Sequence, residues 1–250
     1  MTAAASPSLD SSGNPALSDR VLTDYFVTDR AAATMSVGGV VVKTALLLIL
    51  VIAGGAWGWA SAVEPVAADA RSGYGNTTVT LPGGFWLAAF GAFLLGIVCS
   101  FNPKGAALLG AGYALLQGYC LGAISAAFEA QTEGIVGAAV LATVCVFLVA
   151  LVLYATRIVK PTAKLAFGVS AAIGGLCLLY LFVWVLALFD WAWLYSDEFR
   201  TVGFVVSIIA VVLAALSLTL DFGAVERGVQ GGAPKYLEWY LAFSLMVTLI

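Results

Sequence analysis

Asp221 is a carboxylate at the edge of an otherwise apolar segment, and its position is the strongest chemical signal in the sequence. It directly follows the almost uninterrupted apolar run Thr201–Leu220. A carboxylate at the edge of hydrocarbon is costly to keep ionised, so it usually pairs, becomes protonated or lines a hydrated path. We therefore expect Asp221 to respond to protons or to contact ions. The alternative is a carboxylate that only ends a helix in the membrane interface.

Two further polar side chains lie in or at the end of a single apolar segment, Gly105–Phe128. Gln117 is near the middle of this segment, and Glu129 follows its outer end. A buried amide needs hydrogen-bond partners, so Gln117 should face other helices, either as a structural contact or in the wall of a polar pathway. Glu129 could bind an ion, or it could simply be solvated at the interface.

The sequence offers very little for catalysis. It contains no histidine, which excludes histidine metal sites, histidine proton relays and Ser-His or Cys-His catalysis. It also lacks an H-E-x-x-H motif, a P-loop and a G-x-S-x-G elbow. The four cysteines are in four different apolar segments without paired spacing, so we expect no disulfide. We expect no enzyme activity, cofactor, metal centre or nucleic-acid partner.

The composition is that of a membrane protein. The chain is 62% hydrophobic and 10% charged, with a mean hydropathy of +1.03, whereas soluble domains carry about 25% charged residues. Apolar stretches of about 20 residues cross a bilayer, and we expect spans at Val42–Ala60, Phe85–Ser100, Gly105–Phe128, Gly134–Thr156, Leu165–Phe189, Thr201–Leu220 and from Tyr236 onward. The last segment is short for a full span, so we expect an all-α bundle of seven transmembrane helices with a truncated seventh helix. Residues 1–35 should form a disordered or interfacial tail, and residues 36–250 one transmembrane domain.

The distribution of basic residues predicts the orientation. If the N-terminus is cytoplasmic, that side of the membrane carries nine basic residues, and the other side carries only Arg71 and Arg200. The nine are Arg20, Arg30, Lys43, Lys104, Arg157, Lys160, Lys164, Arg227 and Lys235. Because cytoplasmic loops are enriched in Lys and Arg, we expect a multi-pass protein of the plasma membrane with its N-terminus in the cytoplasm.

Acidic residues are frequent on the opposite, outer side. This side would carry Glu64, Asp69, Glu129, Glu133, Asp190, Asp197 and Glu198. Such a mouth could enrich cations locally. Ordinary solvated loops are the alternative, and charge runs more often have that role.

Glycines are concentrated in two of the apolar segments. Gly118 and Gly122 form a G-x-x-x-G motif in the third segment, and Gly168, Gly174 and Gly175 repeat the theme in the fifth. Small residues at this spacing allow the backbones of neighbouring membrane helices to approach closely. Both segments therefore predict a compact helix bundle.

Several local motifs occur in a characteristic order along the seven segments. They are Met35-Ser-Val-Gly-Gly-Val-Val-Val-Lys-Thr-Ala45, Phe101-Asn-Pro-Lys-Gly105, Leu121-Gly-Ala-Ile-Ser-Ala-Ala-Phe-Glu129, Gly134-Ile-Val-Gly137, Leu220-Asp-Phe-Gly-Ala-Val-Glu-Arg-Gly228 and Glu238-Trp-Tyr-Leu-Ala-Phe243. From about Met35 to Ile250 the chain resembles the Bax inhibitor-1 family, and in particular its bacterial, actinobacterial-type branch.

This resemblance implies a seven-helix bundle with the last helix at its centre, which acts as a pH-responsive calcium leak. In that family a carboxylate at the inner end of the sixth helix pairs with one in the seventh, and Asp221 matches the first of these. Lys104 matches a basic residue that interacts with the pair in some relatives. The resemblance also implies an alternative function, a membrane protein that binds other membrane components, such as a quality-control protease, and regulates a stress response.

Overall fold

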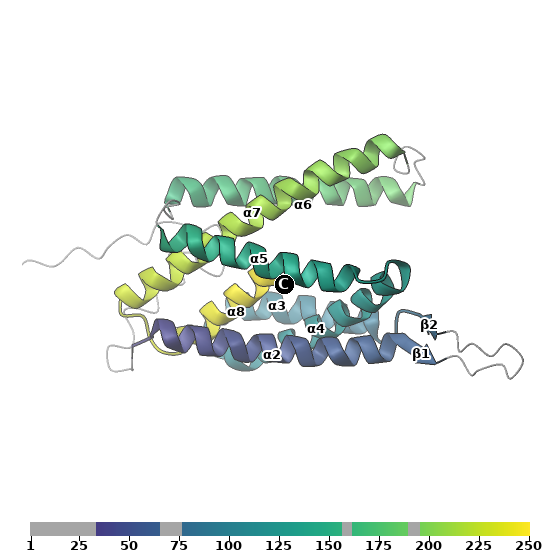
Figure 1. The fold of residues 1–250 in the computed structure, drawn as a ribbon. Helices are drawn as coiled ribbons and strands as arrows, with labels where there is room; N and C mark the ends of the chain where they lie inside the picture. Colours follow the sequence, from purple (N-terminus) through teal and green to yellow (C-terminus); the bar gives the residue numbers. More distant parts are fainter. Residues whose placement is uncertain (1–33, 66–76, 157–161, 190–195) are drawn as a thin grey trace, which may run out of the picture.

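The computed structural model describes residues 34–65, 77–156, 162–189 and 196–250, and its architecture is almost entirely helical (Figure 1). The helices are α2 (Val37–Ala62), α3 (Phe85–Phe101), α4 (Ala106–Gln131), α5 (Ile135–Ala155), α6 (Ala163–Leu188), α7 (Asp197–Gln230) and α8 (Leu237–Leu249). A short 3-10 turn, η2 (Pro103–Gly105), separates α3 from α4. Strands β1 (Val63–Pro65) and β2 (Thr77–Val79) form a small antiparallel ladder.

Five of the described helices are long and apolar enough to cross a membrane, namely α2, α4, α5, α6 and α7. The other two, α3 and α8, are apolar but shorter. Each predicted segment overlaps one of the described helices, and the chain is a multi-pass membrane protein. Most of the predicted tail lies outside the described residues. Its last residue, Met35, is instead buried in the core. The backbone N–H of Met35 donates a 2.8 Å hydrogen bond to the carbonyl of Ala233.

Local sequence explains where several helices begin. Ser36 caps α2 by accepting a hydrogen bond from the Gly39 N–H at 3.0 Å, and Thr162 and Ser196 cap α6 and α7 in the same way. These side-chain oxygens satisfy backbone donors that a helix start leaves without intrahelical partners. Pro103 follows the end of α3, where its missing N–H and fixed φ favour a new helical start over a continuous helix.

The sixth predicted span is longer in the structure than in the sequence analysis. We expected it to end at Leu220, but α7 continues through Asp221 to Gln230 and ends at Gly231, close to the left-handed Gly232 (φ 69°). A hydropathy run stops at the first charge, whereas a helix stops where its backbone hydrogen bonding is interrupted. Asp221 is therefore about 13 Å before the C-terminal end of α7, at ~1.5 Å per residue.

The core is built around α8. Tyr240, Ala242 and Met246 are fully buried, because α8 packs against α2, α4 and α7. In Figure 1 this yellow helix enters from the left of the bundle and ends in its middle. By contrast, α6 packs mainly against α7, and the N-terminal half of α7 is largely exposed. The predicted central position of the last helix agrees with this arrangement.

Candidate functional site

The C-terminal half of α7 places Asp221 against the central helix α8. Asp221 is 4% exposed, and its Oδ2 accepts a 2.6 Å hydrogen bond from the hydroxyl of Thr248 on α8. The same hydroxyl lies 3.0 Å from the backbone carbonyl of Ser244. A hydroxyl has only one proton to donate. Thr248 therefore donates to Asp221 when that carboxylate is ionised, and can donate to Ser244 when a protonated Asp221 donates to Thr248.

A buried carboxylate in an apolar bundle is costly to ionise with few hydrogen bonds. The protonated form of Asp221 satisfies a continuous chain of donors and acceptors, from Asp221 through Thr248 to the Ser244 carbonyl. In the ionised form, the carboxylate of Asp221 accepts a hydrogen bond from the Thr248 hydroxyl, which then cannot donate to the Ser244 carbonyl. The contact between α7 and α8 is thus a place where the binding of one proton changes the local hydrogen bonding.

A second buried carboxylate, Glu238, ties the start of α8 to the start of α2. It is 2% exposed and forms an ion pair with Lys43. Its Oε1 also accepts a 2.8 Å hydrogen bond from the Ser36 N–H and a 3.3 Å hydrogen bond from the Ser36 hydroxyl. The Lys43 ammonium also lies 5.4 Å from the centre of the Trp239 ring. This cluster places a negative charge at the N-terminus of α2, where the helix dipole favours it.

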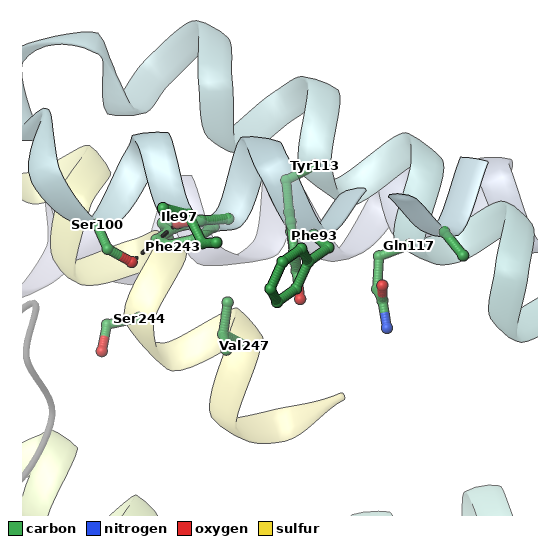
Figure 2. Close-up of a pocket in the computed structure, with 10 residues that line it drawn as sticks. Phe93, Ile97, Ser100, Tyr113, Gln117, Phe243, Ser244 and Val247 are labelled. Atoms are coloured by element: carbon green, nitrogen blue, oxygen red, sulfur yellow. Dashed lines mark hydrogen bonds between the residues drawn. The ribbon is translucent and has the colours of Figure 1, made fainter. Parts of the chain in front are cut away.

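A partly polar cavity of about 340 Å³ lies beside α8, between α8, α3 and α4. Ser100, Tyr113, Gln117 and Ser244 supply its polar lining, among apolar residues such as Phe93. Figure 2 shows the polar ends of Tyr113 and Gln117 projecting in the same direction from α4. Within the part of the chain that the structure describes, neither of these polar ends has a hydrogen-bond partner. They are available to water or to a cation in the cavity.

The cavity and the Asp221 contact share one turn of α8. Ser244 lines the cavity, and its carbonyl is the second acceptor within reach of the Thr248 hydroxyl. A change in the protonation of Asp221 would therefore change the hydrogen bonding of Ser244, a residue that lines the cavity. Gln117 is thus connected to Asp221 only indirectly, because Gln117 lines the cavity with Ser244, and the Ser244 carbonyl lies within reach of the hydroxyl that Asp221 contacts.

The other two sequence candidates have different environments. Glu129 is at the C-terminal end of α4, where its two carboxylate oxygens accept hydrogen bonds from the N–H groups of Gly134 (2.7 Å) and Val136 (3.0 Å). It therefore caps the N-terminus of α5 and closes the α4–α5 turn, as a negative charge at a helix start should. Lys104 is exposed on η2. Neither of them lines the polar cavity.

The acidic residues that we expected on the outer side lie only partly within the described part of the chain. Of these seven residues, the described side chains are those of Glu129, Glu133 and Asp197, and Asp197 lies 3.8 Å from Arg200 in an exposed pair. The other four side chains lie outside the described part. No group of three acidic or thiol side chains converges to hold a metal ion among the residues that the structure describes.

Glu238 and Lys43 are the residues that sequence reasoning missed as a pair. A usable signal was present, because Lys43 lies inside the apolar stretch of α2 and Glu238 lies in the first turn of the last apolar segment. Charged side chains in membrane segments usually pair with one another. With the N-terminus inside, both fall at the inner ends of their helices.

Comparison with known proteins agrees with the resemblance in the sequence. A family profile described as Bax inhibitor 1 like matches residues 14–250, which is nearly the whole chain. No curated protein and no solved structure matches the chain significantly. The match covers every described helix and both carboxylates that contact α8 or lie on it. The chain therefore belongs to the Bax inhibitor 1-like family.

Proposed function

We propose that the protein is a pH-sensitive passive leak for calcium in the plasma membrane, with Asp221 as its proton-sensitive group. The observation that supports this most directly is the buried contact between Asp221 and Thr248, next to a cavity where the polar ends of Tyr113 and Gln117 have no hydrogen-bond partner among the described residues. A membrane helix bundle rarely keeps such groups unless they contact ions, protons or water.

Protonated Asp221 holds α7 against α8 and keeps the path closed. Deprotonation leaves a negative charge in a largely apolar contact, where hydration or a cation stabilises it. The cation then reaches the cavity between α8, α3 and α4, where Tyr113 and Gln117 offer oxygen ligands, the kind that calcium prefers. The leak should therefore increase as pH rises through the range in which Asp221 loses its proton.

Calcium flux into dye-loaded liposomes, measured over a pH series, tests this proposal. Asn cannot lose a proton, so Asp221→Asn should keep the leak low and remove its increase with pH. Thr248→Val should shift the pH response, because it removes the hydroxyl partner of Asp221. Ser207→Ala is the control on the same helix, since the Ser207 hydroxyl bonds only to its own helix at Gly203. An unchanged rate and pH profile in Asp221→Asn would show that Asp221 is not the sensor.

The proposed orientation places the N-terminus in the cytoplasm and the segment between β1 and β2 outside. The nine-to-two bias of basic residues supports it. Compartment-sensitive reporters fused after Gly73 and after Pro161 should report opposite sides of the membrane. Equal signals from the two fusions would contradict the topology.

A regulator that binds another membrane protein is the second candidate function. The packing of α6 favours it, because α6 contacts mainly α7 and Gly168, Gly174 and Gly175 face open space. Purified protein in liposomes separates the two functions. Calcium flux without any partner supports the leak, whereas no flux together with a specifically co-purifying membrane protein supports the regulator.

A further inference from the structure

A second cavity, of about 370 Å³, lies on another side of α8, between α8, α2, α5 and α7. Its walls are formed by large apolar side chains, among them Leu48, Phe147, Phe222 and Leu245. This volume falls in the range of about 300–1,000 Å³ that is typical of ligand pockets. The cavity is thus large enough to hold part of a small molecule or part of a hydrocarbon chain.

Among the described residues that line it, the only side-chain polar atoms are two threonine hydroxyls, and both are already hydrogen-bonded. Thr44 donates to the carbonyl of Val40 at 2.9 Å, and Thr143 donates to the carbonyl of Ala139 at 2.9 Å. Each bond is to the residue's own helix. A buried water needs two to four polar partners, and cavities lined by apolar residues stay dry. Water and ions would therefore find too few polar partners in this cavity to be stable there.

The cavity opens sideways, to the surface that faces the bilayer. Val41 on α2 and Val144 on α5 line it and are 57% and 48% exposed. α2 packs mainly against α4 and α8, and α5 mainly against α7, so among the described residues no extensive α2–α5 contact closes this side. In a multi-pass membrane protein, the exposed surface of apolar helices is covered by hydrocarbon. The material next to the opening is therefore the acyl chains of the bilayer.

We propose that this cavity is a binding site for one acyl chain of a bilayer phospholipid, which enters between α2 and α5. An empty cavity would forfeit dispersion contacts on all its walls, and an acyl chain supplies them without bringing a polar group into the site. The acyl chain packs against Phe147, Phe222 and the side chains of α8 that line the cavity. This proposal goes beyond the calcium leak and does not depend on it.

Photo-cross-linking in nanodiscs tests the site. The probe is a phospholipid with a diazirine in the middle of one acyl chain, and labelled peptides are mapped by mass spectrometry. Peptides that cover Val41–Leu48 and Thr143–Phe147 should be labelled several-fold more than peptides from α6, where Leu178 and Phe182 are 68% and 62% exposed. Exposure alone would favour α6, so the expected enrichment is specific to the cavity.

Cavity-filling variants provide the matched comparison. Ala45→Trp and Thr143→Trp fill the cavity from opposite walls, and each should reduce the labelling several-fold. Leu46→Trp and Val149→Trp add the same side chain to the same two helices at exposed positions that do not line the cavity, and should leave it unchanged. Size-exclusion profiles confirm that each variant is folded, and the two walls provide independent tests.

Three outcomes would overturn the proposal. Labelling that follows surface exposure, without loss in the filled variants, would indicate ordinary annular lipid. Cross-links between two copies of the chain at these peptides would show that protein covers the opening. Specific labelling by a diazirine free fatty acid, with none by the phospholipid, would identify a different source of the hydrocarbon chain.

Discussion

The helix pairs α2–α4 and α6–α7 both combine apolar helices with glycines, yet they pack in opposite ways. In α2–α4, a Cβ on Gly58 would collide with the backbone of Tyr119, and a Cβ on Gly118 would collide with the backbone of Val51. These two helices form the most extensive contact in the bundle. In α6, Gly168, Gly174 and Gly175 have nothing within 4 Å of such a Cβ.

The difference shows that glycine content alone does not predict helix packing in a membrane. The G-x-x-x-G prediction for Gly118 and Gly122 is confirmed, because both glycines meet the α2 backbone. The glycines of α6 were also expected to favour compact packing, but among the described residues none of them meets a neighbouring helix. Lipid tails are as apolar as the helix surfaces, so only shape complementarity between two helices decides whether a small residue becomes a contact.

The largest difference in stability between the two helix pairs is expected when a lysine is replaced, Lys43 on α2 or Lys164 on α6. Lys43→Met on α2 removes the partner of buried Glu238, and breaking a buried ion pair costs about 3–5 kcal/mol. Lys164→Met, at an exposed position on α6, should change stability little. Thermal unfolding in detergent measures both. The double variant Lys43→Met/Glu238→Leu should recover much of the loss, and a failure to recover would show that the pair does more than balance charge.

An intermediate difference is expected at the glycines. Gly118→Ala forces α2 and α4 apart, and overpacking of this kind costs about 1–3 kcal/mol. Gly174→Ala meets no neighbour, so its stability should be unchanged or slightly higher because Ala is the better helix former. Unfolding temperatures of the two variants, measured side by side, give the comparison. Equal losses would indicate that α6 also packs closely, for example against a second protein.

The smallest difference should come from the tyrosines. The hydroxyls of Tyr119 on α4 and Ser61 on α2 lie 3.3 Å apart, so Tyr119→Phe should lose about 0.5–1 kcal/mol. Tyr180 on α6 is 54% exposed, and Tyr180→Phe should be neutral. Chemical unfolding curves resolve a difference of this size. A larger loss for Tyr180→Phe would mean that the exposed face of α6 is engaged.

Asp221 shows how far sequence reasoning reached at the candidate site. The sequence indicated Asp221 because an ionised carboxylate at the end of an apolar segment is costly in free energy. The structure places its side chain in a buried contact with Thr248. The sequence could not indicate Thr248, because a threonine near the end of a helix has many ordinary roles. Gln117 was expected to face other helices or a pathway, and it lines the polar cavity. Glu129 was expected to be solvated or to bind an ion, and both stay predictions; the structure adds that its carboxylate caps α5.

The sequence by itself determined the membrane class, the approximate position of each helix and the family. These follow from local properties, because hydropathy marks spans and Ser36, Pro103 and Gly232 mark where helices start or stop. Only the tertiary structure decided which apolar faces meet each other and which meet lipid. Both kinds of face have the same composition, so no hydropathy pattern separates them. For the same reason, only the structure distinguished the polar cavity on one side of α8 from the dry cavity on another.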